Sequence, residues 1–186
     1  ETGAEVRYIA FSIATKSLPP GFAPDTLARE VREATAELGI PAENLTVHDL
    51  EVRTFPERRQ DILELLIALW EEWRPDVVFQ PSHHDVHQDH QTVAQEGLRA
   101  FKRTTIFGYE VPLNNFYFSY GAYIALEKRH LERKVAALAR YASQKGVAPV
   151  RARSVDRDAY SQRTIWSTLA IAHGPRSQGP QHFALT

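Results

Sequence analysis

Cysteine and methionine are both absent from the sequence, and so is any long hydrophobic run. The lack of cysteine excludes disulfide bonds and thiol chemistry. The longest mostly apolar stretch, from Ile62 to Trp70, is interrupted by Glu64 and is far shorter than the roughly 20 residues that a membrane-spanning helix needs. Because the chain starts at Glu1 and contains no methionine, we expect that it is not a complete, unprocessed translation product.

An excess of charge of one sign is missing as well. The 22 Lys and Arg residues nearly balance the 23 Asp and Glu residues, and no basic run stands out. Nucleic acids and anionic membranes are therefore not expected as partners. A hydrophobic share of 43% over 186 residues is typical of a soluble globular protein, so we expect one domain spanning 1–186. Since no signal-peptide pattern is visible, we also expect a cytoplasmic location.

Apolar residues recur alternately with the periods of strands and of helices. The pattern predicts strands at 6–13, 45–50, 76–80, 105–109 and 182–185, and helices at 26–38, 59–73, 90–102, 126–144 and 164–173, with a polar surface loop at 145–158. This alternation predicts an α/β fold with a mostly parallel sheet and helices on both faces. Loops 14–24, 51–58, 81–89 and 110–122 should then meet at the carboxyl edge of the sheet, where chemistry in such folds usually lies.

One of these loops is unusually rich in side chains that bind metals. Four of the eight histidines fall within eight residues, interleaved with two aspartates: His83, His84, Asp85, His87, Asp89 and His90. Imidazole and carboxylate hold zinc or iron and move protons at neutral pH. His87 and His90 are three residues apart at the start of a predicted helix, so their side chains should project to the same side. Either aspartate could accept a ring N–H and fix a tautomer.

The simpler interpretation is a solvated polar loop in which Asp85 caps the helix. Four histidines after a predicted interior strand favour a functional site instead, although a catalytic metal needs about three protein ligands and some should come from another loop. Among the other histidines, His48 is expected to be structural and His130 solvated. His173 and His182 could reach the carboxyl edge, but their spacing does not show it.

The residues around this loop resemble a known family. The segment from Asp76 to Ser82, followed by Asp85-Val-His87-Gln-Asp89-His90, is similar to the second motif of the PIG-L/LmbE-like zinc deacetylases. The strand-like segment 6–12 and the Tyr-Ala-Ser-Gln sequence at 141–144 also resemble that family's layout. The resemblance implies a Rossmann-like α/β fold and the hydrolysis of an N-acetyl group, usually on an N-acetylglucosamine-type sugar.

The resemblance also implies a role for each matching residue. His90 would be a zinc ligand, His87 would stabilise the oxyanion or transfer a proton, and Asp89 would orient His87. One zinc per subunit would lower the pKa of its bound water and polarise the acetyl carbonyl. The implied substrate is a small N-acetyl sugar or amide.

The sequence departs from the family at its first motif, His-Pro-Asp-Asp, which supplies two zinc ligands and the general base. No histidine in this chain is followed three residues later by an aspartate. Since segment 6–13 resembles the family's second strand, the first strand, its loop and the following helix are expected to be missing. Either that segment lies upstream of Glu1, or the protein has lost its metal site.

Three functional hypotheses follow. The first is a zinc-dependent deacetylase of an amino sugar or a related small amide. The second is a non-catalytic ligand-binding or assembly subunit on the same fold with a degenerate metal site. The third is a hydrolase whose metal is held by His83, His84, His87 or His90 with Asp85. The aromatic segment 116–123 is a secondary candidate for carbohydrate binding, and together with Trp70 and Trp73 it could serve a homo-oligomeric interface.

Overall fold

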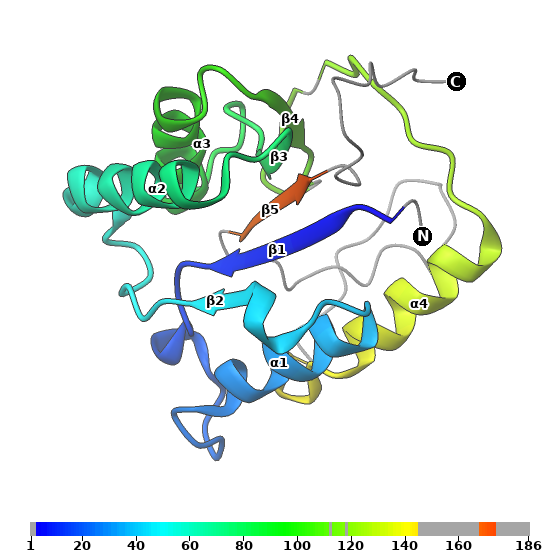
Figure 1. Ribbon diagram of the computed structural model, residues 1–186. Helices are drawn as coiled ribbons and strands as arrows, with labels where there is room; N and C mark the ends of the chain where they lie inside the picture. Colours follow the sequence, from blue (N-terminus) through cyan, green and yellow to red (C-terminus); the bar gives the residue numbers. More distant parts are fainter. Residues whose placement is uncertain (1–2, 112, 118, 145–167, 174–186) are drawn as a thin grey trace.

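The computed structural model describes residues 3–111, 113–117, 119–144 and 168–173. Helices and strands alternate along the chain (Figure 1). The strands are β1 (Glu5–Ala10), β2 (Leu45–Val47), β3 (Val77–Pro81), β4 (Thr105–Tyr109) and β5 (Thr168–His173). The helices are α1 (Thr26–Glu37), α2 (Arg59–Trp73), α3 (Gln88–Ala100) and α4 (Lys128–Ala139). Short 3-10 helices lie at Thr15–Ser17, Ala42–Asn44, Phe55–Arg58 and Ala142–Gln144.

The five strands form one sheet in the order β2-β1-β5-β3-β4. β1 pairs with β2 in parallel, β3 pairs with β4 in parallel, and β5 is antiparallel to both β1 and β3. Four of the five strands therefore run in the same direction. α2 and α3 cover one face of the sheet, and α1 and α4 cover the other (Figure 1). The predicted Rossmann-like α/β architecture, a mostly parallel sheet with helices on both faces, is confirmed.

The central strand β5 corrects one prediction. A helix was expected at 164–173, but Thr168–His173 is a strand, and Ala170 pairs with Tyr8 on one side and with Phe79 on the other. A short apolar run cannot be assigned to helix or strand by its periodicity alone. What fixes this strand is backbone pairing with two segments that are remote in sequence. The loop expected at 145–158, the strand expected at 182–185 and His182 lie outside the described residues.

Two apolar clusters hold the layers together. Between the sheet and α2/α3 lie Ile9, Phe11, Phe55, Ile62, Leu66, Trp73, Val78, Val93 and Phe101. Between the sheet and α1/α4 lie Ala14, Leu27, Val31, Ala34, Val52, Ala137 and Tyr141. Each fully buried Val, Leu, Ile or Phe side chain contributes about 1.5–3 kcal/mol to folding. Burial of this apolar area is therefore what keeps the helices on the sheet.

The interface role expected for Trp73 is wrong, because that ring is only 5% exposed and belongs to the first cluster. Trp70 packs against the same cluster, and the guanidinium of Arg74 lies 3.6 Å from the centre of its ring. Within the described ranges, none of the helices has both the length and the apolar character needed to cross a membrane.

Candidate active site

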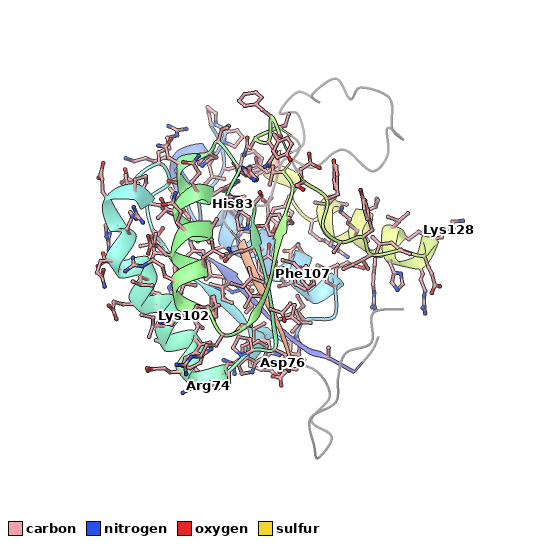
Figure 2. The ribbon with its side chains drawn as sticks, turned by 90° about the horizontal axis from the view of Figure 1, so that it is seen from above. Arg74, Asp76, His83, Lys102, Phe107 and Lys128 are labelled. Carbon is pink, nitrogen blue, oxygen red and sulfur yellow. The ribbon has the colours of Figure 1, made fainter. Side chains whose placement is uncertain are left out.

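The histidine-rich loop connects β3 to α3 at the carboxyl end of β3, the opposite end of the strand from Asp76 (Figure 2). Ser82, which is buried, forms the start of the turn. Its backbone N–H donates to the carbonyl of Tyr109, and its carbonyl accepts from the N–H of Asp85 at 3.1 Å. Its hydroxyl oxygen also accepts from the N–H of His84. These bonds turn the chain so that Asp85 enters the interior while His84 stays at the surface.

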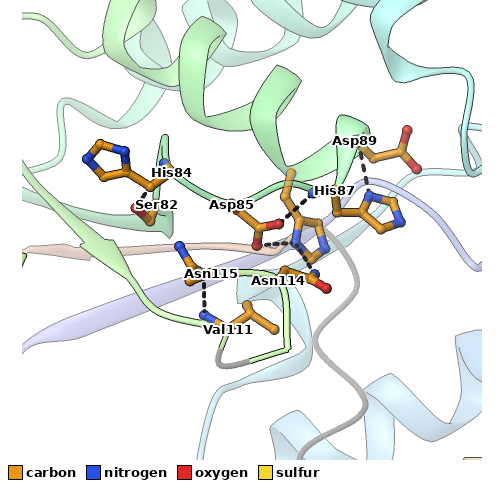
Figure 3. Close-up of polar contacts among 9 residues, drawn as sticks. Ser82, His84, Asp85, His87, Asp89, Val111, Asn114 and Asn115 are labelled. Carbon is orange, nitrogen blue, oxygen red and sulfur yellow. Dashed lines mark hydrogen bonds and ion pairs between the residues drawn. The ribbon is translucent and has the colours of Figure 1, made fainter. Parts of the chain in front are cut away.

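Asp85 is the polar centre of the loop and is completely buried. Its Oδ2 atom lies 2.7 Å from Nδ1 of His90, and its Oδ1 atom accepts the backbone N–H of His87 at 2.8 Å (Figure 3). Because an ionised carboxylate can only accept, Nδ1 of His90 carries a hydrogen, and in the neutral ring Nε2 then has the lone pair. Such carboxylate–histidine pairs leave Nε2 free to bind a metal. His90 is 4% exposed, so its ring is held rigidly.

His87 has the complementary arrangement. It is the N-cap of α3, and its Nδ1 atom accepts the backbone N–H of Asp89 at 3.2 Å. An Nδ1 that accepts a hydrogen bond places the ring hydrogen on Nε2, which makes Nε2–H a donor. Burial lowers the pKa of His87 below 6.5, and nearby His90 lowers it further, so the ring is neutral at pH 7. The His87 and His90 rings are stacked with their centroids 4.7 Å apart, as their spacing predicts.

Asp89 connects this loop to a second one. Its carboxylate accepts the backbone N–H of Arg53 at 2.6 Å and of Phe55 at 3.3 Å. The hydrogen bond between Asp89 and His87 therefore comes from the Asp89 backbone, while the carboxylate holds loop 51–58 against the start of α3. Loop 51–58 was expected at this edge of the sheet, but nothing in the sequence indicates that Asp89 is what fixes it there.

The other two histidines form a separate pair. The rings of His83 and His84 lie 3.9 Å apart, and His84 meets Tyr117 edge to face at 5.5 Å. Among the residues that the structure describes, no three His, Cys, Asp or Glu side chains are placed to hold one metal ion. Both Asp85 oxygens are already engaged. The described residues therefore give no support to a metal held by His83, His84, His87 or His90 with Asp85, and that hypothesis stays untested.

The described residues supply only part of the ligand set of a zinc site. The described residues provide one well-prepared ligand atom, Nε2 of His90, whereas a catalytic zinc takes about three protein ligands. The described residues therefore fit zinc at one position and do not complete its coordination.

Asn114 is a residue of this site that sequence reasoning missed. Its backbone carbonyl accepts the N–H of Val86 at 2.8 Å, and its side-chain nitrogen lies 3.4 Å from Nδ1 of His90 (Figure 3). Loop 110–122 was predicted to reach this edge. An asparagine in an irregular segment gave no further signal, because its role depends on a contact with a residue 24 positions away.

His48 and His130, which lie outside the loop, have structural roles. His48 stacks on Phe11 at 6.1 Å, its backbone N–H bonds to Ala10, and burial lowers its pKa below 6.5, in line with the structural role predicted for it. His130 was expected to be solvated, but its Nδ1 atom accepts the backbone N–H of Glu127 and so caps α4. His173 ends β5 and pairs with Glu5 at the start of β1, so it lies at the opposite end of the sheet from the histidine-rich loop, and the expectation that it could reach the carboxyl edge is wrong.

Comparison with protein families agrees with this geometry. Residues 20–101 match the model of the PIG-L family, which is described as GlcNAc-PI de-N-acetylase. The matched stretch runs from the loop before α1 to the end of α3 and contains the whole histidine-rich loop. Residues 20–101 are therefore a match to the PIG-L family domain, and the resemblance found in the motif is confirmed. A search of curated proteins gave no match to the chain.

Proposed function

We propose that this protein is a hydrolase that removes the acetyl group from an N-acetylated amino sugar or a related small amide. The observation that carries the proposal is the stacked pair of histidines with opposite tautomers. His90 offers a free Nε2 lone pair because Asp85 holds its Nδ1–H, and His87 offers an Nε2–H because the backbone of Asp89 occupies its Nδ1. The PIG-L match over 20–101 supports the same activity.

Attack of water on the acetyl carbonyl builds negative charge on its oxygen, and the departing nitrogen must gain the proton that the water loses. A neutral His87 can stabilise that negative charge by donating its Nε2–H as a hydrogen bond to the oxygen. The transfer of the proton from water to the amine requires a separate general base, because neutral imidazole is too weak an acid to give up its Nε2–H. We assign Asp89 a positioning role, because it holds the first turn of α3, which carries His87 as its N-cap, against loop 51–58.

We further propose that the protein uses one zinc ion per subunit, with His90 as one ligand. When bound, zinc would lower the pKa of a water molecule and polarise the acetyl carbonyl. Asp85 would fix the orientation of His90 toward the ion. The remaining ligands have to come from groups other than the described side chains, because these offer no three-residue cluster.

The test is to measure zinc content and acetate release from N-acetylglucosamine with the full chain, purified in the presence of zinc. The proposal predicts about one zinc per chain and time-dependent release of acetate together with glucosamine. A zinc-loaded, folded protein that releases no acetate from N-acetylglucosamine or from simple N-acetyl amides would contradict it.

One observation favours a second function, a non-catalytic ligand-binding or assembly subunit on the same fold: the described residues do not complete a metal site. That alternative predicts a chain that binds no zinc and yet binds N-acetylglucosamine or another protein. A homo-oligomer and a cytoplasmic location stay predictions, which gel filtration and cell fractionation can check.

A further inference from the structure

Two exposed rings from distant parts of the chain meet beside the candidate active site. His84 comes from the loop after β3 and Tyr117 from the segment after β4, and their rings meet edge to face with centroids 5.5 Å apart and planes at 85°. His83 lies against the other side of His84 at 3.9 Å. Tyr117 is 65% exposed. We call the His84–Tyr117 pair the stacking wall.

The two segments that carry the stacking wall are joined by backbone hydrogen bonds. Ser82 N–H donates to the carbonyl of Tyr109 at 3.0 Å, and Val86 N–H donates to the carbonyl of Asn114 at 2.8 Å. These bonds bracket His84 on both sides along the chain. The wall is therefore attached to the same loop that carries the catalytic candidates, with His84 on one side of Asp85 and His87 on the other (Figure 3).

Packing of the interior does not explain this pair. Phe11 and Phe55, which also meet edge to face, are completely buried, as rings that stabilise a core are. In contrast, both rings of the stacking wall are exposed to solvent, where an edge-to-face contact alone adds little to the stability of the fold. Exposed aromatic faces next to fixed polar groups are typical of sites that bind a ligand with one apolar face and a polar rim.

We propose that the stacking wall binds the apolar C–H face of a pyranose ring and so determines the specificity of the site for amino sugars. The inference rests on the function proposed above. A pyranose presents C–H groups on its faces and hydroxyls around its edge, so an aromatic ring can cover a face while the hydroxyls remain in water.

The experiment compares a ligand that has the sugar ring with one that lacks it. Binding of N-acetylglucosamine and of N-acetylethanolamine to the full chain is followed by NMR titration, which needs no turnover. Tyr117→Ala and His84→Ala should each raise the Kd of N-acetylglucosamine roughly three- to tenfold and leave that of N-acetylethanolamine unchanged. Tyr117→Phe and His84→Phe keep a ring and should bind the sugar as the parent chain does. Leu131→Ala is the control, because Leu131 is 43% exposed and lies on α4, outside the aromatic segment 116–123.

The stacking wall is overturned if Tyr117→Ala binds N-acetylglucosamine like the parent chain, if it weakens both ligands equally, or if the parent chain does not prefer the sugar. The proposed function fails separately. If the parent chain binds the sugar through Tyr117 but releases no acetate, the stacking-wall proposal stands and the proposed hydrolase activity is contradicted. If the parent chain releases acetate and Tyr117→Ala leaves KM unchanged, the proposed hydrolase activity stands and the stacking-wall proposal is contradicted.

Discussion

Oδ2 of Asp85 lies 2.7 Å from Nδ1 of His90, and both side chains are buried. The pair is separated by five residues, so it spans the turn between β3 and α3. Because Oδ1 of the same carboxylate accepts the N–H of His87, one aspartate fixes both the backbone at His87 and the ring of His90. The two histidines therefore keep their relative positions before any ligand arrives.

Asp85→Asn should weaken zinc binding roughly 10- to 100-fold, as expected when the carboxylate behind a histidine ligand is lost. The amide can donate to Nδ1 of His90, which would move the ring hydrogen to Nε2 and remove the lone pair that a metal needs. A competition titration with a zinc indicator measures the affinity, and two-bond ¹H–¹⁵N NMR reports the tautomer. Asp49→Asn, at an exposed position, is the control. Equal zinc affinity in both variants would contradict the role of Asp85.

Asp89→Ala should lower the free energy of unfolding by about 2–3 kcal/mol, because two backbone N–H groups lose a buried charged acceptor. Asp89→Asn keeps one acceptor oxygen and should lower the free energy of unfolding by less. Urea unfolding measures both, with exposed Glu64→Ala as the control. If Asp89 also positions His87, the folded Asp89→Asn protein should show a lower kcat with little change in KM. A loss of stability without any loss of rate would leave Asp89 with a structural role only.

Gly97→Ala should destabilise the protein by about 1–3 kcal/mol, even though alanine is the better helix former. A Cβ at this position would overlap Oε1 of Gln80, a side chain that is 2% exposed and that donates a hydrogen bond to the carbonyl of Ala94. Gln80→Ala should relieve most of the clash, so the double variant should lose less stability than the two single variants together. Gly121→Ala, with open space around its Cβ, is the control, and additive losses would contradict the account.

Acidification should cost stability through His48, whose pKa burial lowers below 6.5. The unfolded chain then binds this proton more readily than the folded chain. The free energy of unfolding should therefore fall as pH drops from about 6.5 toward the folded pKa, and then stay level. His48→Phe, which can still stack on Phe11, should flatten part of that slope. Urea unfolding across this pH range checks the slope, and an NMR midpoint for His48 above 6.5 would reverse the prediction.

Elements with a strong local pattern were predictable from the sequence. α2 has the predicted bounds, Arg59–Trp73, because its apolar residues recur at helical spacing and Pro75 follows. β5 was assigned wrongly, because a central strand of six residues is specified by the strands on both sides of it. The helix expected at 126–144 breaks after α4 into a 3-10 turn at Ala142–Gln144, where Ser143 bonds to buried Glu30 on α1.

The same limit applies to the site. The spacing of His87 and His90 at the start of a helix was sufficient to predict that their rings project together. Which aspartate holds which group was not predictable, since both lie two positions from His87, and the ring of His90 is held by Asp85, five positions away, and not by the adjacent Asp89. Asp89 reaches loop 51–58, and Asn114 reaches His90, through contacts that only the folded sheet edge creates.

The most direct test of the central claim compares zinc content and acetate release in His87→Ala and His90→Ala, with His130→Gln as a control outside the site. The account predicts that His90→Ala loses zinc and activity together. His87→Ala should keep about one zinc per chain and lose roughly 100-fold or more in kcat, the scale of one lost hydrogen-bond donor to the oxyanion. A zinc-loaded His87→Ala protein with unchanged kcat, or a His90→Ala protein that keeps its zinc, would contradict the division of roles between the two histidines.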